Sequence, residues 1–353
     1  MADSRAPLYA GFDGGGTRTT CVLCGPDGSV LGVGSGGRSN YHNTGLRNAL
    51  ASLKRAFAGA LEQSGLAQSR RRLAACYGLA GLDSPEDVAT VKEGIRSMKL
   101  GTGKRSDLVV NDWRTAVAGA FIDEPGVTLI AGTGCVAAAQ RGPGPGVVRV
   151  GGWGHIVDDR GSAYDIGRDA LYAAMRDYDG RGPKTTLLSL VMRKLEVSEP
   201  QGIIARVYPG HMTVSEIASL STLVGEAAGA GDGVALRILG EKGRILGELV
   251  VAAASKLEML DGRFGVSLNG GVFRAGEPLL APLMETIRAS APLAEVVEPR
   301  LPPACGAVVL LLQGDGVRVD GRVVSKIRSS LAEASTPRAP ASSRAPAAAR
   351  PSR

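Results

Sequence analysis

The stretch Leu8-Tyr-Ala-Gly-Phe-Asp13-Gly-Gly-Gly-Thr17-Arg-Thr-Thr-Cys-Val-Leu-Cys24 decides the fold. An apolar run ends at Asp13, three glycines follow, and a β-rich run continues after Thr17, so the stretch predicts strand, tight turn and strand. Glycine amides and the Thr17 hydroxyl can donate to phosphate oxygens, and Asp13 can hold a hydrated Mg²⁺ beside them. The stretch therefore favours a phosphate-binding turn, although this motif alone leaves a plain glycine-rich hairpin open.

The residues that follow predict a mixed sheet with helices on its faces. Residues 29–34 return as a third strand, and a polar loop then leads into an amphipathic helix over about 44–64. A strand at 73–79, a helix after Pro85 and a strand at 107–110 come next. Three antiparallel strands followed by alternating helices and strands are typical of a mixed α/β domain.

The second half repeats this logic. Residues 126–139 read as strand, small-residue turn around Thr133 and strand, and 147–150 supply a third strand. A mostly helical insert over about 161–260 precedes a strand from Val266 and further helices and strands up to residue 313. We therefore predict two similar α/β domains with a nucleotide between them, one turn clamping it from each side. The predicted boundaries are 1–115, 116–317 with the insert and with a last helix that can pack back on the first domain, and a tail at 318–353.

Charge and composition set the tail apart. The 353 residues carry a formal net charge of +7. From Arg318 to the end, eight basic side chains stand against two acidic ones, which leaves about +1 for the rest of the chain. The body is therefore nearly neutral, and we expect no specific nucleic-acid partner. The Ala/Pro/Ser/Arg-rich composition of the tail predicts disorder.

Cysteine usage and hydropathy indicate a protein of the reducing cytoplasm. The five cysteines make no even framework and lie mostly in apolar runs, as buried free thiols do. The N-terminal residues lack a signal-like apolar core, and no window approaches the ~18 apolar residues of a membrane span. We therefore expect a cytoplasmic protein without membrane contact.

Several motifs along the chain, taken in order, resemble one family. They are Asp13-Gly-Gly-Gly-Thr17, Asn111-Asp112, Ala131-Gly-Thr-Gly134, Gly151-Gly-Trp-Gly-His155, Asp159-Arg-Gly-Ser-Ala163-Tyr and Leu268-Asn-Gly-Gly271. This ordered set is similar to that of the N-acetylglucosamine kinase group within the BadF/BadG/BcrA/BcrD-type ATPases, part of the sugar kinase, actin and Hsp70 superfamily. The resemblance implies two duplicated ribonuclease-H-like (actin/Hsp70 ATPase) domains with a nucleotide cleft between them.

The resemblance also implies a reaction. A sugar hydroxyl would attack the γ-phosphate of Mg·ATP, converting N-acetylglucosamine to N-acetylglucosamine 6-phosphate, with Asp112 as general base. Asp112 follows an apolar strand and precedes a helix, at an edge where ligands collect in α/β sheets. From the residues alone, a plain helix cap remains open for Asn111 or Asp112. We also expect a homodimer.

The resemblance assigns residues to each part of this site. Asp13 would hold Mg²⁺, through water. The acceptor sugar would contact Asn40, Gly81, Asp112, Thr133, Gly152, Trp153, Asp159 and Ala163. ATP would contact Gly14, Gly15, Gly16, Thr17, Thr133, Gly134, Ala227, Gly270 and Gly271.

Two alternatives stay open. The same superfamily branch contains ATPases that activate acyl-CoA dehydratases or reductases and hold an iron–sulfur cluster on converging cysteines. Only Cys135 and Cys305 lie in the second half of this chain, and neither begins a glycine-flanked cluster helix. The other alternative is a sugar or nucleotide sensor that kept the fold but lost turnover. The carboxylates Asp13 and Asp112 count against it.

Overall fold

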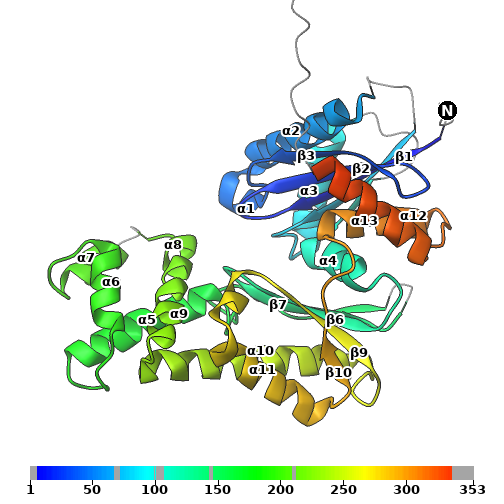
Figure 1. Ribbon diagram of the computed structural model, residues 1–353. Helices are drawn as coiled ribbons and strands as arrows, with labels where there is room; N and C mark the ends of the chain where they lie inside the picture. The colour runs from blue at the N-terminus through cyan, green and yellow to red at the C-terminus, as the bar shows by residue number, and fades with distance from the viewer. Residues whose placement is uncertain are drawn as a thin grey trace, which may run out of the picture.

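The computed structural model describes residues 6–66, 72–98, 100, 107–142, 146–208 and 212–335. The chain forms two lobes, each built on a five-stranded mixed sheet (Figure 1). In the first lobe the strand order is β3-β2-β1-β4-β5. Strands β1, β2 and β3 form an antiparallel meander, while β4 and β5 run parallel to β1. These strands are β1 (Leu8–Gly14), β2 (Thr19–Cys24), β3 (Val30–Gly36), β4 (Leu73–Leu79) and β5 (Leu108–Asn111).

The second sheet has the same topology. Its order, β8-β7-β6-β9-β10, repeats the first, with an antiparallel meander and two strands parallel to β6. The predicted duplicated α/β architecture is therefore confirmed. Strand β9 begins two residues earlier than the predicted Val266. The strands are β6 (Gly126–Ala131), β7 (Cys135–Gln140), β8 (Val147–Gly151), β9 (Phe264–Asn269) and β10 (Ala294–Val296).

Helices cover both faces of the first sheet. Helix α2 packs so closely on β3 that a Cβ at Gly34 would lie 2.0 Å from the Ala56 carbonyl oxygen. Only glycine fits such an approach of helix backbone to strand. Helices α4 and α12 pack against each other and against β1 and β4. The helices of this lobe are α1 (Tyr41–Thr44), α2 (Leu46–Ser64), α3 (Pro85–Met98), α4 (Asp112–Phe121), α12 (Pro303–Gly314) and α13 (Gly321–Ser335).

The predicted helical insert lies between β8 and β9 and extends the second lobe to one side (Figure 1). Within the insert, the short helices over 214–219 and 221–229 are separated by Leu220. None of the described helices is long and apolar enough to cross a membrane. The insert contains α5 (Ala163–Tyr178), α6 (Leu187–Leu195), α7 (Gly202–Val207), α8 (Val214–Ser219), α9 (Ser221–Gly229) and α10 (Gly233–Lys256). The 3₁₀ helix η1 (Gly271–Ala275) and α11 (Glu277–Ser290) follow β9.

The prediction of a disordered tail from residue 318 is wrong for 321–335, which form α13. This amphipathic helix buries Val324 and Ile327, and it packs on β3, an edge strand of the first sheet. The Val30 amide donates to the Ser330 hydroxyl at 2.8 Å. Average composition hid a short stretch with apolar residues at helical spacing. The rest of the predicted tail, 336–353, lies outside the described residues.

Removing residues 321–353 should lower the free energy of unfolding by about 3 kcal/mol, because burial of the two aliphatic side chains of α13 is lost. It would also expose the edge of the sheet. A truncation after Ser335 keeps every described contact and serves as the control. Thermal unfolding of both proteins checks this prediction. Equal midpoints would show that α13 contributes nothing.

Candidate active site

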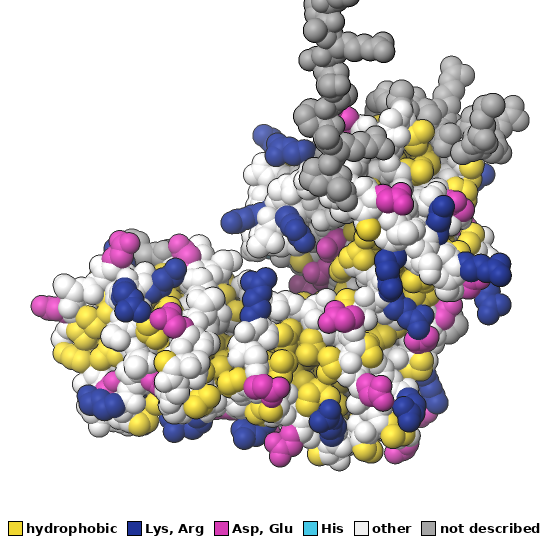
Figure 2. Space-filling model, viewed as in Figure 1, with side chains coloured by type: hydrophobic (Ala, Val, Ile, Leu, Met, Phe, Trp, Pro, Cys, Tyr) yellow, Lys and Arg dark blue, Asp and Glu magenta, His cyan; other side chains and the backbone are white. Residues whose placement is uncertain are grey.

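A cavity of about 790 Å³ lies between the two lobes, and residues of both lobes line it. Figure 2 shows the molecular surface hollowed at this place. The first lobe contributes the β1–β2 turn, the loop after β4 and the start of α4. The second contributes the β6–β7 turn, the end of β8 and the loop that follows it. A cavity of this size can hold a nucleotide and part of a second substrate.

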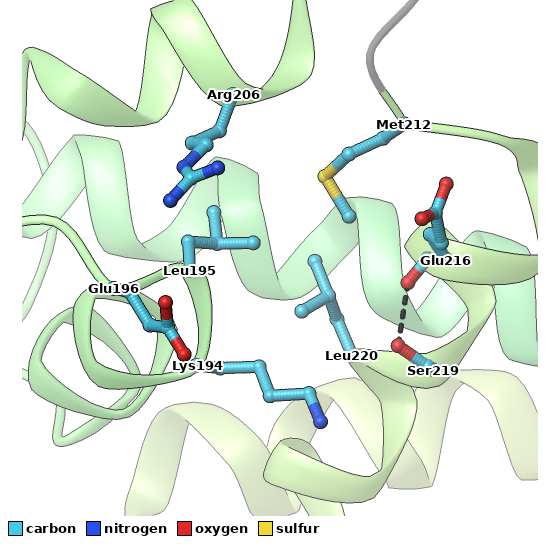
Figure 3. A pocket seen from close by; sticks show the side chains of 8 residues that line it. All are labelled: Lys194, Leu195, Glu196, Arg206, Met212, Glu216, Ser219 and Leu220. Carbon is cyan, nitrogen blue, oxygen red and sulfur yellow. Dashed lines mark hydrogen bonds between the residues drawn. The ribbon is translucent and has the colours of Figure 1, made fainter.

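A second pocket, of about 360 Å³, lies within the helical insert (Figure 3). Leu195, Met212 and Leu220 contribute its apolar wall, with Lys194 and Arg206 beside them. None of the residues assigned from the sequence lines this pocket. The cavity between the lobes is therefore the candidate active site.

The first glycine turn is hydrogen-bonded to the loop that carries Ser39 and Asn40. The Gly15 amide donates to the Arg18 carbonyl at 3.1 Å, and the Gly15 carbonyl accepts from the amides of Ser39 and Asn40. Gly16 and Thr17 are exposed at the cavity wall. Gly14 is buried, and a Cβ there would lie 2.2 Å from the Ser39 hydroxyl. Gly14 thus serves close packing, while Gly15 to Thr17 face the cavity.

The second glycine turn lies on the opposite wall. The Gly132 amide donates to the Gly134 carbonyl at 2.9 Å, and the Ala163 amide donates to the Gly132 carbonyl at 2.8 Å. Thr133 and Gly134 line the cavity. Gly270 does not line it, but its φ of +119° and its approach to the Ala131 carbonyl permit no side chain. That contact carries the chain past the turn to Gly271, which lines the cavity.

Asp112 is the first residue of α4 and lines the cavity. The helix cap is Asn111, whose side chain accepts from the Trp113 amide at 3.4 Å. Burial and then the nearby Asp13 carboxylate raise the pKa of Asp112 to about 7, and Asp83 adds to this increase. Burial also raises the pKa of Asp13, although Arg18 lowers it. A carboxylate with a pKa near 7 is suited to accept a proton.

Asp159 presents an unsatisfied acceptor. It lines the cavity beside the second turn, where a Cβ on Gly134 would lie 2.8 Å from its Oδ2. Its Oδ1 is buried and has no hydrogen-bond partner. Burial raises the pKa of Asp159, and the amides of Cys135 and Gly154 oppose that shift. A buried carboxylate oxygen without a donor fits a ligand that brings a hydroxyl or amide.

Two further predicted acceptor contacts meet on the first lobe. The Asn40 side chain caps α1 by accepting from the His42 amide at 3.1 Å. Gly81 has a φ of +83°, and a Cβ there would lie 2.8 Å from Asn40 Oδ1. Both residues line the cavity, as does Gly152 on the other lobe. Glycine at 81 keeps this part of the wall open.

Other predicted residues lie elsewhere. Trp153 is 61 % exposed beside the cavity, and Ala163 begins α5; neither lines the wall. Asp13 stands behind the first turn, at the end of β1. Ala227 is 1 % exposed within the apolar core of the second lobe, on α9, so it is not part of the cavity wall.

Several cavity residues escaped the sequence interpretation. Arg149 is a charged residue within the short predicted strand at 147–150. A charge at that position could have indicated a residue of the cavity. Asp83 lies two residues after Gly81, which was assigned. The residues missed in this way include His42, Asp83, Arg149, Ser215 and Arg274.

Comparison with known proteins agrees with this geometry. A model of the BadF/BadG/BcrA/BcrD ATPase family matches residues 10–310. The chain belongs to the BadF/BadG/BcrA/BcrD ATPase family. This membership implies that the chain uses ATP. The matched range includes both glycine turns and the three aspartates that line the cavity, Asp83, Asp112 and Asp159.

Two relatives similar in sequence to this chain are named as sugar kinases. The N-acetylmuramic acid/N-acetylglucosamine kinase of Clostridium acetobutylicum is 33% identical over 301 residues, covering 85% of this chain and 96% of the relative. The N-acetyl-D-glucosamine kinase of Dictyostelium discoideum is 28% identical, covering 86% and 98%. The crystal structure of a candidate N-acetylglucosamine kinase from Chromobacterium violaceum superposes with a TM-score of 0.70 at 27% identity, covering 88% of this ATPase and all of that chain.

The residues present fit Mg·ATP better than an iron–sulfur cluster. Asp13 is a carboxylate close to the amides of the first turn, which suits a hydrated Mg²⁺ shared with phosphates. Among the described residues, no group of three or more His, Cys, Asp or Glu side chains could hold a metal ion by itself. All five cysteines are buried free thiols. Burial raises the pKa of every one, which does not suit thiolate ligands.

Proposed function

We propose that this ATPase is an amino-sugar kinase that converts N-acetylglucosamine to N-acetylglucosamine 6-phosphate. The observation that carries the proposal is the meeting, in one cavity, of two glycine turns with Asp112 and Asp159. Two glycine turns on facing walls suit a triphosphate, and two carboxylates suit a sugar hydroxyl and its proton. The kinase names of the relatives support the choice of acceptor.

On the nucleotide side, this chain would position the phosphates of ATP and help to neutralise their charge. The amides of Gly16 and Thr17 and of Thr133 and Gly134 would donate to phosphate oxygens from the two walls, and Gly271 would lie against the nucleoside. Asp13 would hold Mg²⁺ through water. When bound, the metal supplies positive charge that offsets the negative charge of the phosphates. Phosphoryl transfer depends mainly on such positioning.

On the acceptor side, Asp159 would accept a hydroxyl proton in a hydrogen bond, with Asn40 on the facing lobe. Asp112 would take the proton of the attacking hydroxyl as its oxygen bonds to the γ-phosphorus. The bond from that phosphorus to the bridging oxygen breaks, and ADP leaves. Gly81 and Gly152 leave room for the ring, and Trp153 stands at the rim to cover an acetyl group.

An ADP-release assay with a panel of acceptors tests the proposal. The panel contains N-acetylglucosamine, N-acetylmannosamine, glucosamine, glucose and N-acetylmuramate. We expect the highest kcat/KM with N-acetylglucosamine, and a phosphorus NMR spectrum of the product showing coupling to the C6 protons. Absence of sugar-dependent ADP release, together with measurable nucleotide binding, would favour the sensor instead.

The proposed base predicts a pH dependence. With a pKa of about 7, Asp112 carries a proton at lower pH and cannot accept another. We therefore expect kcat/KM to fall about tenfold for each unit below pH 7. Direct detection of ADP over pH 5 to 9 checks this, since coupling enzymes bring their own profiles. A flat profile down to pH 5 would exclude a base with a raised pKa.

We also propose that the chain is a homodimer. Large apolar side chains stand exposed on the helical insert, where a second copy could cover them: Tyr172, Tyr178 and Ile204 are 60%, 48% and 60% exposed. Light scattering after size-exclusion chromatography tests this. A mass near 36.2 kDa would indicate a monomer.

A further inference from the structure

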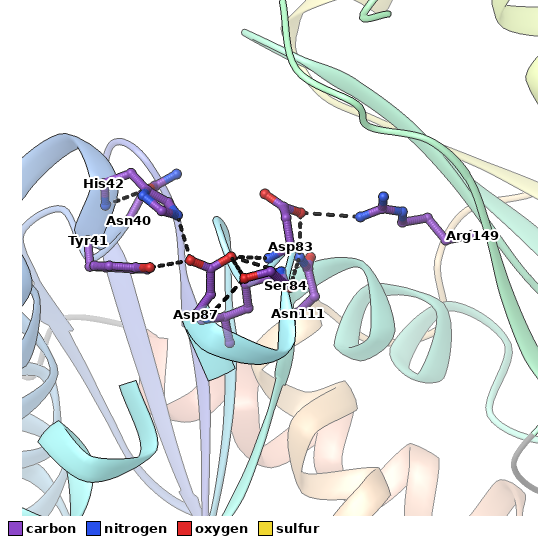
Figure 4. Close-up of polar contacts among 9 residues, drawn as sticks. Asn40, Tyr41, His42, Asp83, Ser84, Asp87, Asn111 and Arg149 are labelled. Carbon is purple, nitrogen blue, oxygen red and sulfur yellow. Dashed lines mark hydrogen bonds and ion pairs between the residues drawn. The ribbon is translucent and has the colours of Figure 1, made fainter. Parts of the chain in front are cut away.

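One ion pair joins the two lobes across the mouth of the active-site cavity. Arg149 on β8 contacts Asp83, in the loop after β4, with 3.3 Å between Nη1 and Oδ1. Both side chains line the cavity. Figure 4 shows Arg149 extending from the second lobe to Asp83 of the first. The chain itself crosses between the lobes near 121–126 and 297–303. The ion pair is an additional, non-covalent connection, and it lies at the cavity.

Asp83 is connected to the proposed base. Its Oδ1 also accepts from the Asn111 side-chain amide at 3.2 Å, and the same amide donates to the Leu82 carbonyl at 3.1 Å. Asn111 caps α4, whose first residue is Asp112. A hydrogen bond that fixes the cap also fixes the start of the helix. The Asp83 carboxylate is therefore connected through one residue, Asn111, to Asp112, the proposed base.

The loop of Asp83 is held to the acceptor wall by Asp87. The Asp87 carboxylate accepts from the amides of Asp83 and Ser84 at 3.1 and 2.8 Å and from the Tyr41 hydroxyl. Figure 4 shows these contacts around one carboxylate. Tyr41 begins α1, which Asn40 caps. The loop of Asp83 and the predicted sugar contact Asn40 thus belong to one polar network.

Arg149 is connected to the acceptor wall of the other lobe. Its guanidinium lies 4.9 Å from the centre of the Trp153 ring, a cation–π geometry. The Arg149 side chain is only 20% exposed, whereas that of Asp83 is 55% exposed. Trp153 belongs to the loop that also carries Gly152 and Asp159. The ion pair therefore links the acceptor-binding elements of the two lobes.

A partly exposed ion pair contributes little to the stability of a single domain. Between two lobes that can move apart, the same small energy acts on the equilibrium between open and closed arrangements. We infer that Asp83 and Arg149 form a latch that holds the lobes closed over the acceptor and keeps Asn111 and Asp112 in position. The inference rests on the proposed function for its kinetic part. Asp83 and Arg149 are positioning residues in this scheme.

Kinetics of four variants test the latch. D83N and R149Q should each lower kcat/KM for N-acetylglucosamine about tenfold, mainly through KM for the sugar, with KM for ATP changed less. The exchanged double variant D83R/R149D restores an opposite pair and should recover the part of that loss that comes from lobe closure, but not the part that comes from the lost Asp83 acceptor for Asn111. R263Q is the matched control, because Arg263 and Glu295 make an ion pair of the same 3.3 Å length within the second lobe. A pair with a merely structural role would change thermal stability without a selective rise in KM for the sugar.

A second measurement does not need turnover. Small-angle scattering with a non-hydrolysable ATP analogue and N-acetylglucosamine should give a larger radius of gyration for D83N and R149Q than for the unchanged protein and R263Q. The exchanged variant should return to the smaller value. If the unchanged protein phosphorylates no sugar, the proposed function fails, while this comparison still decides the latch. Single variants that match R263Q in scattering, or an exchanged variant that recovers neither scattering nor kinetics, would overturn it.

Discussion

Replacing Asp112 by Asn should lower kcat by about 10³-fold, while binding of ATP and of N-acetylglucosamine stays close to that of the unchanged protein. The amide has nearly the shape of the carboxylate but cannot accept the proton of the attacking hydroxyl. Positioning by the two glycine turns would remain, so a residual rate is expected. Single-turnover measurement of ADP formation, with calorimetric binding of both ligands, checks the prediction.

The stability of this variant gives an independent result. Burial and the neighbouring Asp13 carboxylate oppose ionisation of Asp112, so the native fold bears the cost of that charge at neutral pH. D112N should therefore unfold at the same temperature as the unchanged protein or at a higher one. D261N, at an exposed aspartate between α10 and β9, is the matched control for both measurements. Turnover by D112N at the rate of D261N would remove Asp112 from the role of base.

Local sequence pattern was sufficient for much of the fold. The strand, glycine turn and strand at 8–24 were predictable, because apolar alternation and glycine clusters act within a few residues. Their repetition at 126–139 was enough to predict the duplication. Helix α13 was missed because composition was averaged over a long tail, which hid the burial of Val324 and Ile327.

The candidate site was predictable only in part, for a different reason. Asp112, Asp159 and the glycine turns belong to short motifs, so they were identified along the chain. The contact of Arg149 with Asp83 depends on how two lobes lie relative to each other, and no local pattern encodes that. Ala227 was placed by a loose resemblance within the insert, where helices pack mainly for the core.

Replacing Asp159 by Asn should raise KM for N-acetylglucosamine about 100-fold and leave KM for ATP within a few-fold. Its Oδ1 is buried without a donor, so a sugar hydroxyl that donates to it would form a charge-assisted hydrogen bond. The amide is a weaker acceptor and can present a donor where the site needs an acceptor. This contact would stabilise the bound sugar and the transition state alike. Its loss should therefore raise KM for the sugar more than it lowers kcat.

The neighbouring residue provides the matched control for this variant. Asp158 is exposed and does not line the cavity, so D158N removes the same charge one residue away and should leave KM for the sugar unchanged. Steady-state kinetics with each substrate varied in turn separates the two variants. If D159N and D158N raise KM for the sugar equally, general charge near the cavity is responsible. If D159N instead raises KM for ATP, Asp159 belongs to the nucleotide side, and the acceptor must lie nearer to Asn40 and Gly81.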